Sequence, residues 1–97
     1  VYVKDVVNAN ILAATTSEEK TFGQVFNIGS GNNFSVNNVV KTIIGNESIK
    51  PEYKASVIEP KDTLADISKA RTVLKWNPKF SFEKGIEETI DWFKKRI

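Results

Sequence analysis

The chain has 97 residues, of which 40% are hydrophobic and 27% charged, as in a globular domain rather than a disordered segment. It contains no cysteine and no histidine, which excludes disulfide bonds, thiolate metal sites and a histidine general base. The formal net charge of +2 is too small to indicate a nucleic-acid partner, and no apolar run approaches the ~20 residues of a membrane-spanning helix. These features predict one soluble, cytoplasmic α/β unit with neither a nucleic-acid nor a membrane partner.

The N-terminal region is expected to form a helix over residues 6–14, with Asp5 as its N-cap. Apolar side chains cover most of this helix: Val3, Val7, Ile11 and Ala14 form one face, and the rest of the apolar surface consists of Val6, Ala9, Leu12 and Ala13. A helix that is apolar nearly all round is normally buried between two layers. Because the sequence also begins with the β-rich Val1-Tyr2-Val3 and lacks methionine, we interpret it as a piece of a longer protein.

A strand–helix–strand unit is expected in the middle of the chain. Residues 22–28 have the apolar content of a short buried strand, and residues 29–33 have the composition of a loop. Ser35 is a suitable N-cap for a helix that ends at Gly45. A second strand is expected within residues 49–57, so that a right-handed crossover would join two parallel strands.

Two more helices are predicted in the last third of the chain. Asp66 can cap a helix that ends before Pro78, and its inward face would consist of Ile67, Ala70 and Leu74. Ser81 can cap the final helix, whose apolar stripe contains Phe82, Ile86, Ile90, Phe93 and Ile97. Trp92 lies off this stripe, so it either widens the apolar face or covers a further surface.

Gly29-Ser30-Gly31 lies between a predicted strand and a predicted helix, where phosphate-binding loops occur. The dinucleotide fingerprint requires a third glycine, and Phe34 occupies that position here. We therefore interpret the two glycines as a structural turn. The polar segment 59–66 follows a predicted strand and precedes a predicted helix, a position that suits either a ligand-binding loop or a capped connector.

Five blocks of sequence occur in the order found in one enzyme family. They are Val1-Tyr2-Val3-Lys4-Asp5-Val6-Val7 followed by Ala9, Phe26-Asn27-Ile28-Gly29-Ser30-Gly31, Ser35-Val36, Ala65-Asp66-Ile67-Ser68-Lys69-Ala70, and Leu74-Lys75-Trp76-Asn77-Pro78. Over essentially its whole length, the chain resembles the C-terminal part of the extended short-chain dehydrogenase/reductases. The resemblance is closest to the UDP-glucose 4-epimerase-like group of NAD-dependent nucleotide-sugar epimerases and dehydratases.

This resemblance implies an α/β fold: a helix-rich substrate-binding subdomain, spanning residues 1–97, with a small parallel strand–helix–strand unit and flanking helices. In the family, an N-terminal Rossmann domain carries the glycine-rich NAD fingerprint and a catalytic Tyr-x-x-x-Lys pair, and neither motif occurs in this sequence. The chain would therefore recognise the nucleotide sugar, with no catalytic, cofactor-binding or metal-binding residue of its own. The family further implies NAD in the parent enzyme, a Rossmann domain as partner and a homodimeric parent. The apolar surfaces of helix 6–14 and the position of Trp92 predict that the isolated piece self-associates.

Three substrate-binding residues follow from the family's Arg-x-Gly-Asp/Glu motif and its surroundings. Glu59 matches the acid that accepts the ribose hydroxyls, and Thr63 occupies a place that contacts the sugar in some relatives. Ser56 stands where the family has a phosphate-binding arginine, and Ile58 stands at the glycine. These departures weaken the expected nucleotide site, so a stand-alone, non-catalytic binding module remains the alternative function. Alternatively, Glu59 binds no ligand and only forms a surface ion pair with a nearby lysine such as Lys61.

Overall fold

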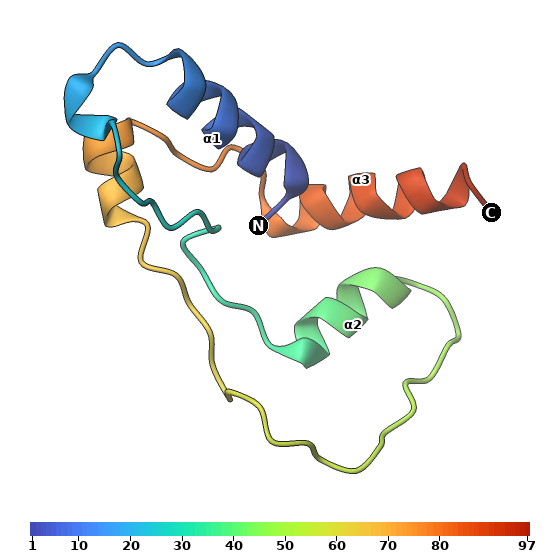
Figure 1. Cartoon of the computed structure of the whole chain (residues 1–97). Helices are drawn as coiled ribbons and strands as arrows, with labels where there is room; N and C mark the ends of the chain where they lie inside the picture. The colour runs from blue at the N-terminus through green and yellow to red at the C-terminus, as the bar shows by residue number, and fades with distance from the viewer.

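The computed structural model describes residues 1–97 and is entirely helical apart from its loops (Figure 1). Its elements in chain order are α1 (Val3–Thr15), the 3₁₀ turn η1 (Glu19–Thr21), α2 (Val36–Ile44), the π-helical turn η2 (Ala70–Leu74) and α3 (Phe82–Lys94). Of these helices, none combines the length and the apolar character that a membrane crossing needs.

A small core forms where α1 meets the segment that contains η2. Ala9 of α1 packs there with residues brought from the last third of the chain, namely Ile67, Ala70, Leu74 and Trp76. Half-buried side chains close its edge, namely Leu12, Phe26 and Ile28. The prediction that Ile67, Ala70 and Leu74 point inward is confirmed. The helix that carries them differs from the predicted one, because it widens into a π-turn that ends with Lys75 in the left-handed conformation.

The predicted capping residues are confirmed at the helix ends where the cap is an interaction between residues close in sequence. Ser35 accepts a hydrogen bond from the backbone N–H of Asn38, and Ser81 accepts one from that of Lys84. Gly45 ends α2 with a positive φ of 58°, which a glycine adopts without a steric penalty. The Asp66 carboxylate accepts the backbone N–H of Ser68, so it caps the turn that leads into η2.

Asp5 has a different role from the one predicted. The helix starts at Val3, with Tyr2 at the N-cap position, so the prediction that Asp5 caps α1 is wrong. The Asp5 carboxylate is buried and accepts the backbone N–H groups of Lys79 and Phe80, at 2.8 and 3.1 Å. It therefore caps the chain segment that enters α3, and its role is structural.

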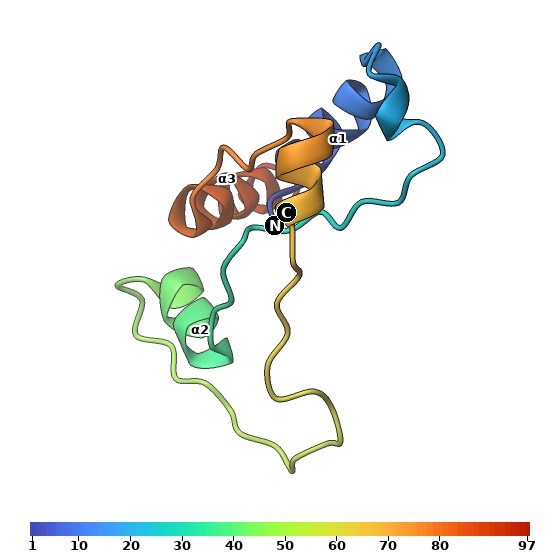
Figure 2. The ribbon, with the colours of Figure 1, turned by 90° about the vertical axis from the view of Figure 1, so that its left-hand side faces the viewer.

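The predicted strand–helix–strand unit is not formed in this structure, which contains no β-strand. No backbone hydrogen bond joins residues 22–28 to residues 49–57, and the second segment runs through the long exposed loop 45–66. Two views at right angles show this loop extending away from the helices, whereas α2 lies beside α3 and contacts it (Figures 1 and 2). Pairing of these segments within an α/β fold stays a prediction.

Candidate functional site

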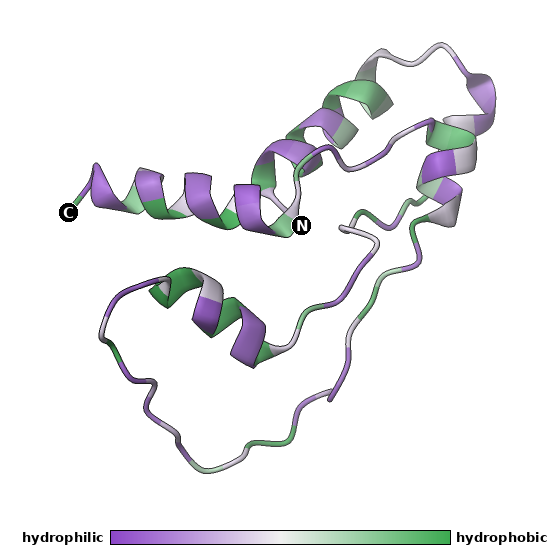
Figure 3. Cartoon of the chain, turned by 180° about the vertical axis from the view of Figure 1, so that it is seen from behind, coloured by the Kyte–Doolittle hydropathy of each residue, from purple (hydrophilic) through white to green (hydrophobic).

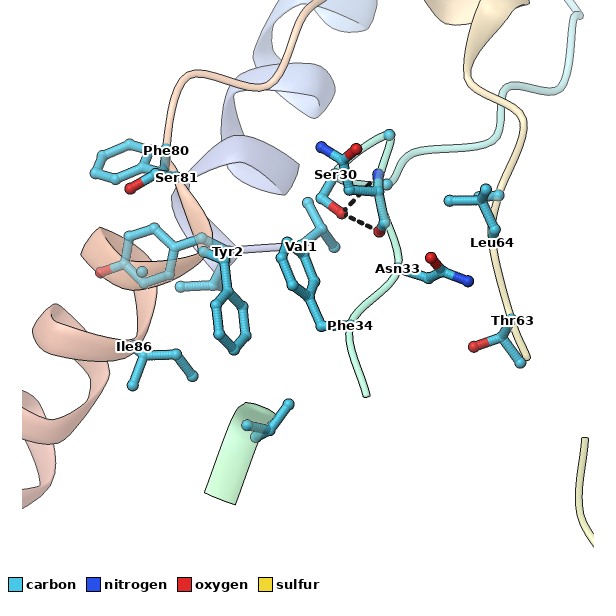
Figure 4. Close-up of a pocket in the computed structure, with 18 of the residues that line it drawn as sticks. Val1, Tyr2, Ser30, Asn33, Phe34, Thr63, Leu64, Phe80, Ser81 and Ile86 are labelled. Carbon is cyan, nitrogen blue, oxygen red and sulfur yellow. Dashed lines mark hydrogen bonds between the residues drawn. The ribbon is translucent and has the colours of Figure 1, made fainter. Parts of the chain in front are cut away.

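A cavity of about 780 Å³ lies between the N-terminal segment, the glycine-containing loop and the start of α3. Its walls come from four parts of the chain: residues 1–3, 29–34, 63–65 and 80–89, together with Val39 of α2. In Figure 4, Thr63 and Leu64 line one side of the cavity, across from Val1 and Phe34. A cavity of this volume falls within the range of small-molecule sites.

The glycine-containing loop is shaped by close packing. A Cβ atom on Gly29 would lie 3.2 Å from the Cβ of Ala65, so glycine allows the loop to approach the segment before Asp66. Gly31 has a φ of +82°, which side chains other than glycine's adopt with strain. The hydroxyl of Ser30 donates to the carbonyl of Asn32 at 2.7 Å. These contacts agree with the interpretation of the loop as a structural turn.

Aromatic side chains form the apolar wall of the cavity. The rings of Phe34 and Phe82 are stacked, with centroids 4.2 Å apart and planes inclined by 14°. Tyr2 contacts Phe80 edge-to-face, with centroids 4.8 Å apart. A Cβ on Gly85 would lie 3.2 Å from the Cβ of Tyr2, so this glycine lets the N-terminal segment pack directly on α3. The wall therefore depends on residues from both ends of the chain.

The structure places only one of the three predicted site residues at the cavity. Thr63 lines it, whereas Ser56 and Glu59 lie exposed on the 45–66 loop and are not among the lining residues. The Glu59 carboxylate makes no ion pair, so the alternative in which it pairs with Lys61 is not observed. The acid is thus available to an external hydrogen-bond donor.

A cluster of three polar groups lies beside the cavity, where the N-terminal segment meets α3. Glu88 accepts hydrogen bonds from the hydroxyl of Tyr2 at 2.8 Å and from the ammonium of Lys4 at 2.9 Å. The hydrogen bond from Lys4, followed by that from Tyr2, lowers the pKa of the Glu88 carboxyl. The same contacts with Glu88 raise the pKa values of Tyr2 and Lys4. This cluster fastens α1 to α3.

The polar side chains of the cavity are mainly neutral hydrogen-bonding groups. Its hydroxyl and amide side chains are those of Tyr2, Ser30, Asn32, Asn33, Thr63, Ser81 and Thr89, and the Tyr2 hydroxyl already donates to Glu88. No group of three or more acidic, histidine or cysteine side chains that could hold a metal ion occurs in the structure. Such a surface can orient a ligand through hydrogen bonds and aromatic contacts.

Sequence reasoning missed the aromatic wall. The sequence indicates Phe34 only as a residue in place of a glycine, and Phe82 only as part of an apolar stripe. Their stacking joins residues 48 positions apart, and no local pattern indicates such a pair. The nearest signal in the sequence is the presence of a large aromatic residue directly after a glycine-containing loop.

Comparison with known proteins identifies relatives over nearly the entire chain. The sequence model of the GDP-mannose 4,6 dehydratase family matches residues 1–89. No solved structure matches the chain.

Three curated relatives illustrate the range of activities. A UDP-glucuronate 4-epimerase from Thermodesulfobacterium geofontis is 31% identical over 99% of this chain, and a UDP-glucose 4-epimerase from Halalkalibacterium halodurans is 31% identical over 97%. A dTDP-D-glucose 4,6-dehydratase from Mus musculus is 29% identical over 99% of the chain. The matched regions make up 30%, 29% and 29% of these relatives, so the chain spans less than a third of their length.

Proposed function

Because the chain belongs to the extended short-chain dehydrogenase/reductase family of NAD-dependent nucleotide-sugar epimerases and dehydratases, we propose that it forms the nucleotide-sugar-binding part of such an enzyme. The parent protein, meaning the full polypeptide to which this chain belongs, would oxidise a sugar hydroxyl with NAD. It would then reduce the resulting keto intermediate or eliminate water from it. The chain itself would recognise the substrate and close its pocket. The resemblance further implies a cytoplasmic, homodimeric parent.

One observation carries this proposal: enzymes that act on UDP and dTDP sugars align with 97–99% of the chain. The geometry is compatible with it. Thr63 and the Gly29–Phe34 loop line one cavity, and the loop that leads to Thr63 presents the unpaired carboxylate of Glu59. A carboxylate can accept hydrogen bonds from two neighbouring ribose hydroxyls. Ser56 supplies a neutral hydroxyl where a guanidinium would bind phosphate more strongly.

The glycine-containing loop of this chain does not fit the dinucleotide-binding turn that holds NAD. A dinucleotide-binding turn needs open glycine positions close to the pyrophosphate. Here Gly29 packs against Ala65, and Phe34, at the third glycine position, stacks on Phe82. We therefore assign no residue of this chain to NAD, and the cofactor of the parent would bind to its Rossmann domain.

Glu59→Ala in the parent protein tests the proposal at one residue. Calorimetric titration with a UDP sugar should show binding weakened by roughly 1.5–3 kcal/mol, the range for a hydrogen bond to a charged group. The melting temperature should stay nearly unchanged, because the side chain is exposed and makes no ion pair. Glu52→Ala, at another exposed acid of the same loop, is the matched control and should leave binding unchanged.

Ser56→Arg provides a gain-of-function test of the same site. Restoring a guanidinium at the phosphate-binding position should strengthen UDP-sugar binding. If Glu59→Ala leaves the affinity intact but lowers the melting temperature by several degrees, Glu59 is structural and the site assignment is wrong. If the parent binds no nucleotide sugar at millimolar concentration, the chain belongs to a non-catalytic binding module instead.

A further inference from the structure

Tyr2 connects the candidate site with a residue that lies outside it. Tyr2 lines both the cavity described above and a second hollow of about 640 Å³, which we call the groove. The groove lies between the start of α1 and the polar side of α3, and Glu88 lines the groove but not the cavity. Figure 3 shows hydrophilic and hydrophobic bands alternating along α3, as expected for a helix with one polar and one apolar side. Tyr2 therefore forms part of the wall that separates the cavity from the groove.

Three contacts fix the Tyr2 side chain in this wall. Its Cβ packs against Gly85, where a Cβ atom would lie only 3.2 Å away. Its ring meets the ring of Phe80 edge-to-face, with centroids 4.8 Å apart (Figure 4). Its hydroxyl donates to Oε2 of Glu88 at 2.8 Å. Because a tyrosine has few side-chain torsions, one contact on the ring and one at the hydroxyl suffice to fix its orientation.

The carboxylate of Glu88 is itself held in place. The Lys4 ammonium donates to the same oxygen, Oε2, at 2.9 Å, and the Glu88 side chain is only 27% exposed. The ammonium also lies 5.9 Å from the ring centroids of both Tyr2 and Phe80. A partly buried carboxylate with a charged donor is a stronger and better-oriented acceptor than a freely hydrated one. The orientation of the Tyr2 ring therefore depends on Glu88.

We propose that Glu88 is a positioning residue of the candidate site: it holds the Tyr2 ring in the cavity wall and so prepares the cavity for its ligand. The inference rests on the proposed function, which assigns the cavity to a nucleotide sugar. A wall that is already fixed loses little conformational entropy when the ligand binds, whereas a mobile ring must be ordered at that moment. Removal of the Glu88 carboxylate therefore weakens ligand binding by about two- to tenfold, although Glu88 does not line the cavity.

A double-mutant cycle in the parent protein separates this role from a purely structural one. UDP-glucose is titrated calorimetrically into Glu88→Ala, Tyr2→Phe and the double variant. Tyr2→Phe keeps the ring but has no hydroxyl for Glu88 to hold, so each single variant should bind about two- to tenfold more weakly and the double variant no more weakly than either. Glu88→Gln keeps an acceptor oxygen and should bind within about twofold of wild type. Glu87→Ala, at the exposed neighbouring acid that lines neither hollow, is the matched control and should bind like wild type.

A measurement without ligand keeps this inference apart from the proposed function. Tetranitromethane nitrates tyrosine rings, and peptide mass spectrometry reports Tyr2 separately from Tyr53, which is 81% exposed. Nitration of Tyr2 should be several-fold faster in Glu88→Ala than in wild type, while that of Tyr53 stays the same. Equal Tyr2 rates, or binding losses that multiply in the double variant, would overturn the inference. Faster Tyr2 nitration in a parent that binds no UDP-glucose supports the hold of Glu88 on Tyr2 and contradicts the proposed function.

Discussion

The carboxylate of Asp5, in the first turn of α1, accepts the backbone N–H of Lys79 at 2.8 Å, across 74 residues of sequence. Its second oxygen accepts the next N–H, that of Phe80, and the backbone carbonyl of Asp5 accepts the indole N–H of Trp76. One residue thus fastens α1 to the segment that leads into α3. This junction positions Val1–Val3 and Phe80 on the same cavity.

Asp5→Ala should destabilise the chain by about 3 kcal/mol, because two half-buried backbone N–H groups lose a charged acceptor. Urea unfolding measures the change. Asp5→Asn retains one acceptor oxygen and should lose less. Asp62→Ala, at an exposed acid in the 45–66 loop, should change stability by no more than about 0.5 kcal/mol. Equal stabilities of Asp5→Ala and Asp62→Ala would show that the Asp5 junction contributes nothing.

Lys75→Gly should stabilise the chain. Lys75 ends η2 with a φ of 62°, a left-handed conformation that costs a side-chain-bearing residue about 1–2 kcal/mol. Glycine avoids this cost but loses more entropy on folding, so we expect a net gain of about 0.5–1 kcal/mol in urea unfolding. Lys69→Gly, at a residue in the right-handed helical conformation, should instead lose about 1 kcal/mol. A stability loss in Lys75→Gly would contradict this account of the turn.

The Tyr2–Lys4–Glu88 cluster should make stability depend on pH in the acidic range. The pKa of Glu88 is lower in the folded chain than its ordinary value of 4.5, so the unfolded chain binds the proton more tightly. The stabilisation is therefore fully present above that ordinary value and disappears as the pH falls through the folded pKa. The stability difference between wild type and Glu88→Gln should be largest near neutral pH and should decrease as the pH falls below 4.5 through the folded pKa.

The matched control for this pH profile is Glu47→Gln, since Glu47 is exposed and forms no ion pair. Its stability should follow that of the wild type at every pH. A difference between wild type and Glu88→Gln that stays constant down to the lowest pH would mean that ionisation of Glu88 is not what fastens α1 to α3.

Local chemistry explains which features could be predicted from the sequence. Ser35, Ser81 and Gly45 cap helices through contacts within a few residues, and their roles are confirmed. The prediction for Asp5 was wrong because the sequence does not distinguish a residue that caps its own helix from one that caps a distant segment. The capped segment here lies 74 residues away.

The strands and the site were harder to predict for a related reason. A strand needs a neighbouring strand to pair its backbone groups, and residues 22–28 find none within this chain. Similarly, the family motif indicates Ser56 and Glu59 but not where their loop folds, and the structure leaves both exposed. The aromatic wall formed by Phe34 and Phe82 depends on tertiary packing alone.

The central claim is that this chain recognises a nucleotide sugar as part of a larger enzyme. Calorimetric titration of the parent protein with UDP-glucose, with free glucose as the control ligand, tests it most directly. We predict saturable binding of UDP-glucose with a dissociation constant below about 1 mM, equivalent to more than about 4 kcal/mol, and no detectable binding of glucose. Absence of heat from UDP and dTDP sugars at millimolar concentration would contradict the claim.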